Sequence, residues 1–481
     1  MMKRTKIVAT ISDLRCDVEF IRPLVEAGVN VVRMNTAHMN FEGISRVINN
    51  TRAVSPNVAV LLDTKGPEVR TTVLEGDSEV KREFKAGDKV VFMANPEAKT
   101  NNETINVNYV NFVKDVPVGA RILVDDGALA FDVEKKEGDK LFTTCQNNGK
   151  LGSRKSVNVP GVRIDLPSLT EKDRNNILHC LKNHDIDFIA HSFVRNKKDI
   201  AEIQTILDEY QSKVQIIAKI ENQEGVDNID EIIENCAGIM IARGDLAIEV
   251  PAEEVPGIQR MIIKKCVDAK KPVIVATQML HTMIDNPLPT RAEVSDIANA
   301  VYYRTDAVML SGETANGKYP LEAVQTMARI VRKAEADLAL NYDDEVPYSK
   351  EVSTTTAFLA KQAVRSVRDI NTEAIITDSF SGRTARYLSS FRATVPVCAV
   401  CYDATLSRQL ALSYGVTAHY AGETNCERER LAAGIKSFIA SGLIKEDTQV
   451  AYMSGTIGNT GAAHSLEIET VKVLLDACSK K

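Results

Sequence analysis

Acidic and basic side chains follow two apolar segments of the chain, in positions where they could hold a metal ion beside an anion. Lys219 and Glu221 are two residues apart at the end of one segment, so on a strand both side chains face the same side. Gly244 and Asp245 follow the next apolar segment and add a second carboxylate. Two carboxylates with substrate oxygens are a common protein environment for Mg²⁺. For each motif taken alone, a structural ion pair is the alternative.

Polar residues also follow three other apolar segments. Arg33 and Asn35 alternate at the end of one segment, which places both side chains on one face, and His38 lies just beyond them. Residues 63–70 combine carboxylates, cations and a hydroxyl, although a solvated charged loop would look similar. Thr277 supplies a hydroxyl at the end of another segment. These residues can form one site only if their strands lie side by side.

Eight short apolar segments, separated by helical patterns, could bring these residues together. Their ranges are 6–11, 29–35, 59–65, 188–193, 215–221, 238–244, 272–279 and 307–312. Nearly continuous apolar strands that alternate with helices are typical of a parallel sheet covered on both faces. Eight such units predict an α/β fold with a (β/α)₈ TIM barrel, in which active sites lie at the carboxyl ends of the strands. The polar residues would then meet at one mouth.

The regular spacing fails after the third segment, where a long stretch precedes the fourth. Residues 71–165 show short alternating segments separated by turn sequences such as Ala86-Gly87-Asp88 and Glu137-Gly138-Asp139. This pattern predicts an all-β insertion that could act as a lid over the barrel mouth. We therefore expect the barrel to comprise residues 1–66 and 165–345, with an inserted β lid domain at 67–164.

The last part of the chain predicts a separate α/β domain at 346–481. A helical pattern at 320–340 precedes a polar stretch, Asn341–Lys350, that is typical of a linker. Strand-like segments recur at 374–377, 395–400, 417–419 and 448–453 between helical patterns. Cys398 and Cys401 form a C-x-x-C sequence. Residues three apart on a strand point to opposite faces, so this pair predicts two structural thiols and no zinc site.

Composition excludes several classes of function. The formal net charge of -6 gives no basic surface for nucleic acid or for an anionic membrane. No apolar run approaches the roughly 18 residues that span a bilayer, and the first residues lack the pattern of a signal peptide. Nine scattered cysteines suit a reducing compartment better than a set of disulfides. We expect a cytoplasmic protein that binds neither nucleic acid nor membranes.

Several ordered motifs resemble those of the pyruvate kinase family over nearly the whole chain. They include Arg33-Met34-Asn35, Leu62–Glu68, Lys155–Pro160, Ser192–Arg195, Lys219–Asn222, Ala242–Leu246, Ala276–Leu280 and Met309–Ala315. The family's architecture, a barrel with a lid after the third strand and a C-terminal regulatory domain, matches the segmentation above. The resemblance implies a phosphotransferase of glycolysis that transfers the phosphoryl group of phosphoenolpyruvate to ADP, giving pyruvate and ATP.

The resemblance also implies roles for the charged residues of the barrel. Glu221 and Asp245 would hold Mg²⁺ or Mn²⁺, and Arg33 would pair with the phosphoryl group of the substrate. Lys219 would stabilise charge on the transferring phosphoryl group and on the enolate. These roles suit phosphoryl transfer, because the enzyme contributes mainly positioning and charge neutralisation to that reaction.

Further roles follow for the substrate carboxylate and the nucleotide. By resemblance, Thr277 and the amides near Gly244 and Asp245 would bind the carboxylate. Thr277 would also help to deliver the proton that converts enolpyruvate into pyruvate. The residues on the nucleotide side would be His38, Arg70, Lys155 and Asn35.

A monovalent cation site is implied as well. Asn35, Asp63 and Thr64 resemble the K⁺ ligands of the family, and Glu68 resembles the acidic variant that accompanies K⁺ dependence. The family usually has a serine where this chain has Ala37, so one K⁺ ligand is missing. Other departures from the family pattern are Ser12-Asp13, Ser156, His281 and Arg304-Thr305.

The C-terminal domain carries a candidate effector loop. Residues 377–386 run from a strand into a helix and combine hydroxyls with a glycine, a pattern that could bind phosphate at a helix start. The resemblance implies a phosphorylated effector here, with the glycine-rich turn Ser454–Gly461 close by. Its ligands would be Ser379, Ser381, Gly382, Arg383 and Thr384. A simple helix cap at Ser381 is the alternative.

Two other classes of function stay open. A metal-dependent lyase would also place a glutamate and an aspartate on barrel strands, but it has no need for a lid or for residues 63–70. A catalytically impaired barrel retained as a metabolite sensor would explain Ala37 and Ser12-Asp13. The intact set of Lys219, Glu221 and Asp245 favours a live enzyme. The segment 289–293 resembles the interface helix of the family, which implies a homotetramer.

Overall fold

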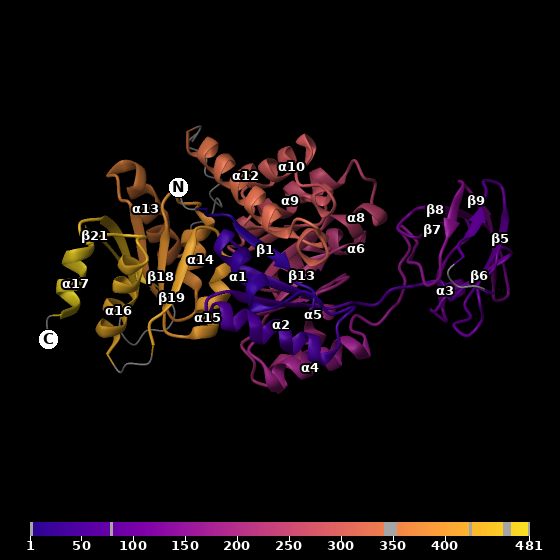
Figure 1. The fold of residues 1–481 in the computed structure, drawn as a ribbon, viewed down its shortest axis with the longest axis horizontal. Helices are drawn as coiled ribbons and strands as arrows, with labels where there is room; N and C mark the ends of the chain where they lie inside the picture. Colours follow the sequence, from indigo (N-terminus) through magenta and orange to yellow (C-terminus); the bar gives the residue numbers. More distant parts are fainter. Residues whose placement is uncertain (1–2, 77–79, 341–353, 423–425, 456–462, 480–481) are drawn as a thin grey trace.

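Three bodies follow one another along the long axis of the molecule (Figure 1). The computed structural model describes residues 3–76, 80–340, 354–422, 426–455 and 463–479. A barrel occupies the centre, an all-β body lies at one end, and an α/β body at the other end carries the C-terminus. The predicted linker Asn341–Lys350 lies outside the described residues.

Eight parallel strands close into the predicted barrel, in the order β1-β16-β15-β14-β13-β12-β3-β2. The strands are β1 (Lys6–Thr10), β2 (Val31–Asn35), β3 (Ala59–Asp63), β12 (Phe188–His191), β13 (Gln215–Ile220), β14 (Gly238–Ala242), β15 (Val273–Ala276) and β16 (Ala307–Leu310). The fold class and the eight strands are therefore confirmed. All predicted segments except 29–35 extend too far at their carboxyl ends, because the polar residues there leave the sheet and turn into the mouth. Gly244, for example, lies inside helix α8 (Arg243–Glu249).

Helices cover the barrel, whose strands separate two layers of apolar packing. They are α1 (Val18–Ala27), α2 (Phe41–Val54), α4 (Glu171–Asn183), α5 (Lys197–Glu209), α6 (Gln223–Asp227), α7 (Ile229–Asn235), α9 (Val255–Asp268), α10 (Arg291–Tyr302), α11 (Gly312–Ala315) and α12 (Pro320–Leu340). Most of the longer helices begin at a polar cap, such as Asp17, Asn40 or Thr170, whose side chain accepts a backbone N–H. One apolar layer lies between strands and helices, and a second fills the barrel interior.

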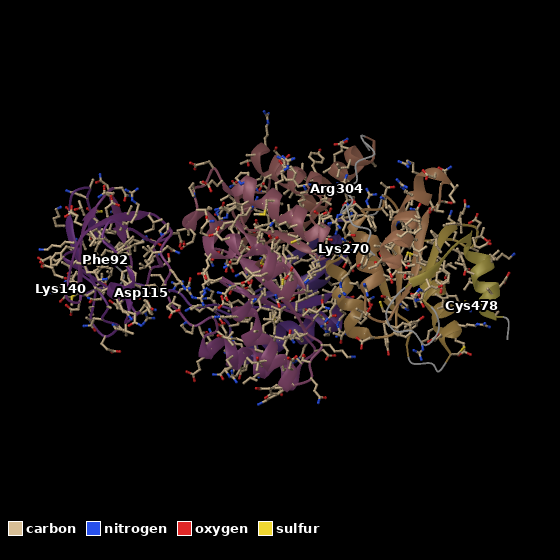
Figure 2. The ribbon with its side chains drawn as sticks, turned by 180° about the vertical axis from the view of Figure 1, so that it is seen from behind. Phe92, Asp115, Lys140, Lys270, Arg304 and Cys478 are labelled. Atoms are coloured by element: carbon tan, nitrogen blue, oxygen red, sulfur yellow. The ribbon has the colours of Figure 1, made fainter. Side chains whose placement is uncertain are left out.

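The inserted body is a β-domain built around an aromatic core. Its elements are β4 (Arg82–Phe84), β5 (Lys89–Met93), β6 (Thr104–Asn106), α3 (Phe112–Asp115), β7 (Arg121–Val124), β8 (Leu129–Glu137), β9 (Lys140–Cys145), β10 (Gly149–Leu151) and β11 (Val157–Asn158). Phe84, Phe92 and Phe131 meet at its centre, where ring centroids of neighbouring pairs are 5.2 and 5.8 Å apart. Figure 2 shows Phe92 inside this body, well away from the barrel. The limits 67–164 stay a proposal for this domain.

The C-terminal body has one sheet in the order β19-β18-β17-β20-β21. Its strands are β17 (Ala374–Ser379), β18 (Val397–Cys401), β19 (Val416–Tyr420), β20 (Gln449–Gly455) and β21 (Ala463–Thr470). The helices are α13 (Thr355–Asp369), α14 (Arg383–Ser390), α15 (Ala404–Gln409), α16 (Glu427–Ala440) and α17 (Val471–Ser479). The antiparallel edge strand β21 was not predicted, because its residues do not form an apolar run. Cys398 and Cys401 are buried in different apolar clusters, as expected for opposite faces of β18.

Buried polar contacts join the C-terminal body to the amino-terminal face of the barrel. The Asp187 carboxylate, just before β12, pairs with Arg52 at 2.8 Å and with Arg408 of the C-terminal body at 2.6 Å. The short helical turn Leu410–Leu412 places Leu412 against the apolar residues inside the barrel. These contacts lie at the end of the barrel opposite the strand ends that carry Lys219 and Glu221, and we call this end the barrel floor. No helix in the described parts of the chain is long and apolar enough to cross a bilayer.

Candidate active site

Barrel closure brings most of the predicted substrate and metal residues to one mouth. Arg33 and Asp63 come from β2 and β3, which pair in register with Asn35 opposite Asp63. Lys219 lies near the end of β13, and Glu221 follows that strand directly. Asp245 lies in the first turn of α8, directly after β14. The strand order therefore places carboxylates and cations from distant parts of the sequence in contact.

A network of buried charges forms the centre of this mouth. Lys219 Nζ lies 2.9 Å from Glu221 Oε1 and 3.1 Å from Asp63 Oδ1, and Asp63 Oδ2 lies 2.6 Å from Arg33 Nε. Arg33 also donates to Thr10 Oγ1 at 2.9 Å. The side chains of Asp63 and Glu221 are only 1% exposed. Because buried charges are costly without partners, this alternation of signs is what allows four ionisable groups to share the space.

The network shifts the pKa values of its members in opposite directions. Burial alone lowers the pKa of Lys219, but the facing carboxylates of Asp63 and Glu221 outweigh burial and raise it above its usual value. Burial alone would raise the pKa of Asp63, but Arg33 and Lys219 hold it below its usual value. Lys219 therefore stays protonated, and Asp63 stays ionised, across the physiological range of pH.

Glu221 and Asp245 form a second, like-charged pair. Burial raises the pKa of Glu221 to about 7, and the charge of Asp245 adds to that effect even though Lys219 opposes it. Burial also raises the pKa of Asp245, whose carboxyl hydrogen-bonds to Glu221. Two carboxyls can share a hydrogen bond only if one holds a proton, so the pair is poised to exchange that proton for a cation. This donor set fits a divalent ion such as Mg²⁺, which takes few protein ligands.

Left-handed backbone positions the second oxygen of Glu221. Phe193, which follows β12, has φ of 55° and donates its N–H to Glu221 Oε2 at 2.6 Å. Gly66 has φ of 71°, and a Cβ at this residue would lie 2.7 Å from atoms of Ser192 and Phe193. Only glycine allows the loop after β3 to pass this close to the loop after β12.

Thr277 and Gly244 form the opposite wall of the mouth. Thr277 has φ of 68° and Gln278 has φ of 54°. This left-handed conformation is strained for Thr277 because its side chain is β-branched. The Gly244 N–H donates to Thr277 Oγ1 at 2.8 Å, and that hydroxyl donates to the Ala276 carbonyl at 2.6 Å. Arg243 fixes the turn, since its guanidinium donates to the Thr277 carbonyl at 2.6 Å and pairs with Asp296 at 2.7 Å.

The predicted K⁺ ligands lie together, but each already has a protein partner. Asn35 Oδ1 accepts the Ala37 N–H at 3.1 Å, and the Thr64 carbonyl accepts the Ser192 hydroxyl at 2.7 Å. Both oxygens of Asp63 contact cations, as described above. These oxygens suit a large monovalent cation, and Ala37 adds no hydroxyl to the set.

The predicted nucleotide residues are spread over two bodies. His38 is exposed on the barrel beyond β2. Arg70 pairs with Glu68 at 2.8 Å, and Lys155 pairs with Asp125 at 2.9 Å, both in the β-domain or its connection. The Thr71 N–H donates to the Lys155 carbonyl at 2.8 Å, so the two chain segments that connect to the β-domain run side by side. Asn35 lies with the K⁺ candidates on β2.

A cavity of about 390 Å³ opens between the β-domain and the barrel mouth. Its lining includes Glu68, Asp126, Phe193, Arg195 and Asp245. Asn158 of β11 donates to Glu249 of α8 at 2.8 Å, which ties the two bodies together beside the cavity. The β-domain therefore sits at the mouth as expected of a lid.

Two residues in the mouth were not predicted as site residues. The Ser192 hydroxyl lies 2.6 Å from Lys219 Nζ, and Arg243 organises the turn around Thr277. Both belong to motifs that the sequence made visible, Ser192–Arg195 and Ala242–Leu246. Their contacts depend on neighbouring strands, so the motifs alone did not assign them a role.

The candidate effector loop lies after β17, far from the mouth. Ser379 Oγ accepts the Gly382 N–H at 3.0 Å, and Gly382 itself caps α14 with φ of 76°. The alternative of a helix cap at Ser381 is therefore wrong, because the left-handed turn requires glycine at the cap position. Arg383 and Thr384 form the first turn of α14. Most of the turn Ser454–Gly461 lies outside the described residues.

Comparisons with known proteins agree along the whole chain. The family model described as the pyruvate kinase barrel domain matches residues 2–324, and the pyruvate kinase alpha/beta domain matches residues 358–469. The chain is 46% identical to a pyruvate kinase of Borreliella burgdorferi over 98% of both proteins. It is 44% identical to a pyruvate kinase of Geobacillus stearothermophilus, covering 99% of this chain and 81% of that protein. The crystal structure of a pyruvate kinase from Cryptosporidium parvum aligns with a TM-score of 0.90 at 35% identity, covering 98% and 96% of the two chains.

The raised pKa of Glu221 predicts a pH dependence of stability in the metal-free protein. An unfolded glutamate loses its proton near pH 4.5, whereas folded Glu221 keeps it to about pH 7. The folded state therefore binds more protons in this window, and stability falls as pH rises through it. We expect the free energy of unfolding of the wild type to fall by on the order of 3 kcal/mol across this window, and we expect no such fall in Glu221→Gln. Both proteins are measured by thermal unfolding in the presence of a chelator. The exposed Glu209→Gln variant should behave like the wild type, and an unchanged pH slope in Glu221→Gln would contradict the assignment.

Proposed function

The chain belongs to the pyruvate kinase family, and from that premise we propose how its own residues carry out the reaction. The reaction transfers the phosphoryl group of phosphoenolpyruvate to ADP and gives pyruvate and ATP, so the chain is a phosphotransferase of glycolysis. The observation that carries the residue assignments is the network of Lys219, Asp63, Glu221 and Arg33 at the barrel mouth.

Lys219 and Arg33 would bind the phosphoryl group of the substrate through charge and hydrogen bonds. Lys219 stays protonated because two carboxylates face it, so its ammonium group can donate to the transferring phosphoryl oxygens and to the enolate oxygen. Arg33 is held by Asp63 and Thr10, which leaves the fork of its guanidinium oriented before substrate arrives. Preorganised donors of this kind stabilise charge that develops during the transfer and need no rearrangement at that moment.

Glu221 and Asp245 would hold the divalent ion. The family generally requires Mg²⁺ and K⁺, and the coupled carboxyls of Glu221 and Asp245 supply a two-ligand site for Mg²⁺ or Mn²⁺. When bound, the ion supplies positive charge next to the oxygens of the substrate. The Phe193 N–H fixes Glu221, and Lys219 limits the repulsion between the two carboxylates until the ion is in place.

Thr277 and the start of α8 would bind the substrate carboxylate. The N–H groups near Gly244 and Asp245 lie in the first turn of α8, where backbone donors have no partner within the helix. The Thr277 hydroxyl donates its proton to the Ala276 carbonyl and accepts the Gly244 N–H. We assign it the role of passing a proton toward the enolate carbon after the transfer, which makes the overall reaction favourable.

The nucleotide enters from the side of the lid. Asn35 ends β2 and His38 follows it, while Arg70 and Lys155 lie on the connections to the β-domain. In the absence of nucleotide, Arg70 pairs with Glu68 and Lys155 pairs with Asp125. Binding of the ADP phosphates would exchange these carboxylates for phosphate oxygens, which are the better partners of an arginine fork.

The remaining assignments concern assembly, regulation and location. The family resemblance of residues 289–293 supports a homotetramer. The left-handed turn at Gly382, with hydroxyls on either side, supports an effector loop. Its residues are Ser379, Ser381, Gly382, Arg383 and Thr384. A cytoplasmic location agrees with the nine scattered cysteines, most of which are buried. The domain limits 1–66, 67–164, 165–345 and 346–481 complete the proposal.

Lys219→Met should abolish the formation of pyruvate from phosphoenolpyruvate and ADP. The substitution removes a buried cation that faces two carboxylates, and we expect kcat to fall by about 10³-fold or more. The measurement is pyruvate formation with Mg²⁺ and K⁺ present, with the exposed Lys264→Met variant as control. Activity in wild type that needs no ADP would support a lyase, and no activity in wild type under any salt would support the sensor class.

Ala37→Ser should lower the K⁺ concentration that gives half of the maximal rate. The serine hydroxyl would add the donor that the set of Asn35, Asp63 and Thr64 lacks, and one added ligand is expected to lower the half-saturating K⁺ concentration by roughly fivefold. The rate is measured against K⁺ concentration, with a large inert cation keeping ionic strength constant. Ala37→Gly, which adds no oxygen, serves as control. Equal K⁺ curves for all three proteins would place the cation elsewhere.

The effector loop predicts a response to phosphorylated metabolites. Substrate saturation curves recorded with and without a panel of sugar phosphates and nucleotides should differ for the wild type. The difference should disappear in Thr384→Val, since this variant removes a hydroxyl from the first turn of α14. Identical curves for the wild type under all conditions would remove the effector assignment.

A further inference from the structure

A serine of the β-domain connects a candidate nucleotide residue with an acidic turn at the edge of the cavity. Ser156 is one of the positions at which this chain departs from the family pattern. It directly precedes β11, and its backbone pairs with that of Arg70 in an antiparallel bridge. On its other side it contacts the turn of residues 125–127, which joins β7 to β8. The mechanism described above gives neither Ser156 nor this turn a role.

The backbone of this turn needs support from its surroundings. Asp125, Asp126 and Gly127 have left-handed φ values of 55°, 54° and 86°. Glycine adopts this region freely, whereas two consecutive aspartates keep it only where other contacts favour it. The Asp125 N–H donates to the Ser156 carbonyl at 3.0 Å, and the Asp125 carboxylate pairs with Lys155 at 2.9 Å. These contacts hold the first residue of the turn.

The hydroxyl of Ser156 holds the second residue of the turn. Its Oγ accepts the Asp126 N–H at 3.0 Å and donates to Asp126 Oδ1 at 2.6 Å. A hydroxyl has a single proton to donate, and here that proton goes to a carboxylate, which is a stronger acceptor than a neutral oxygen. One side chain therefore holds both the backbone and the carboxylate of Asp126. A glycine or an alanine at this position would hold neither.

Held in this way, Asp126 belongs to the same cavity as the proposed metal ligands. Asp126 and Ser156 line the cavity of about 390 Å³ together with Glu68 and Asp245. Burial is the main cause that raises the pKa of Asp245, and the charges of Glu68 and Asp126 add to it although Lys219 opposes them. The charge of Asp126 thus acts on a residue of another body. Asp126 is itself exposed, so its carboxylate is open to an ion in the cavity.

We propose that Ser156 is a positioning residue, which holds the Asp126 carboxylate toward the cavity so that the lid strengthens the binding of the divalent cation. The inference rests on the proposed function, because it takes Glu221 and Asp245 as the ligands of that ion. A carboxylate beside a cation site raises the affinity of the site through its charge, without ligating the ion itself. Ser156 contributes by keeping this charge in place, since the strained turn leaves Asp126 other conformations once the hydroxyl is gone.

Binding of Mn²⁺ to the substrate-free protein measures this contribution directly. Ser156→Ala frees the Asp126 carboxylate and is expected to raise the Kd for Mn²⁺ about threefold, as measured by calorimetric titration. Asp126→Asn removes the charge and should raise the Kd by at least as much, whereas Ser156→Thr keeps the hydroxyl and should bind like the wild type. Two matched controls should leave the Kd unchanged. Ser153→Ala removes a hydroxyl from the same connection, and Asp132→Asn removes a carboxylate that pairs with Arg121 elsewhere in the β-domain.

A double variant separates positioning from a purely structural role. If Ser156 acts through the charge of Asp126, Ser156→Ala should change the Kd for Mn²⁺ in the wild type and should change nothing further in Asp126→Asn. A serine that only stabilises the lid would act in both backgrounds, so additive effects would overturn the proposal. An unchanged Kd in Ser156→Ala, with binding lost in Glu221→Gln, would also overturn it and would leave the metal pair in place. Full Mn²⁺ binding by Glu221→Gln would refute the metal pair and with it this inference.

Steady-state rates give an independent readout in the working enzyme. With both substrates saturating, Ser156→Ala should raise the Mg²⁺ concentration that gives half of the maximal rate by about threefold. The value of kcat should change by less than about twofold, because the loss concerns binding of the ion and is overcome by more Mg²⁺. Ser156→Thr should restore the wild-type curve. A fall in kcat that persists at saturating Mg²⁺ and is not restored by threonine would show general damage to the lid and contradict the assigned role.

Discussion

The catalytic mouth depends on the burial of opposite charges in strict alternation. Arg33, Asp63, Lys219 and Glu221 follow one another at distances of 2.6 to 3.1 Å, and their carboxylates are almost closed to water. An unpaired charge in such a place would cost several kcal/mol. Each group is therefore held by its neighbours, and the positions of the donors that face the substrate are set before the substrate binds. The remaining imbalance falls on Glu221 and Asp245, the pair that we propose as ligands of the divalent cation.

Strained backbone around the mouth also holds groups of the site in position. Phe193, Thr277 and Gln278 all have left-handed φ values, a conformation that costs on the order of 1 kcal/mol or more for such residues. In return, the Phe193 N–H points at Glu221, and the Thr277 hydroxyl meets the first turn of α8. The strained residues directly follow β12 and β15, so the rigid barrel strands hold them in place. The site thus combines rigid strands with short loops that could not keep their shape alone.

The two faces of the barrel use charge in different ways. At the mouth, ionisable groups are arranged around space that substrates enter. At the floor, the carboxylates of Asp187 and Asp306 pair with Arg408 and Arg392 of the C-terminal body and fasten the two bodies together. Both faces follow the rule that a buried charge must meet an opposite one.

Much of this protein could be predicted from its sequence, because the relevant signals are local. Apolar runs with β-branched residues predicted all eight barrel strands, and turn sequences predicted the β-domain. Polar residues at strand ends predicted that Lys219, Glu221 and Asp63 lie at one mouth, where the structure brings them into contact. The same local signals missed β21, whose edge position needs no apolar run. They also left a helix cap at Ser381 as an alternative, whereas the left-handed turn places the cap at Gly382.

Only the tertiary structure decided which of these groups touch. Ser192 contacts Lys219 because β12 lies beside β13, and Asn35 lies level with Asp63 because β2 and β3 pair in that register. Arg243 contacts Thr277 because the two residues follow the neighbouring strands β14 and β15. The ion pairs at the barrel floor join residues more than eighty positions apart in the chain. Local periodicity determines which face of a strand a side chain occupies, whereas barrel closure and strand register determine its partners, and those depend on the whole chain at once.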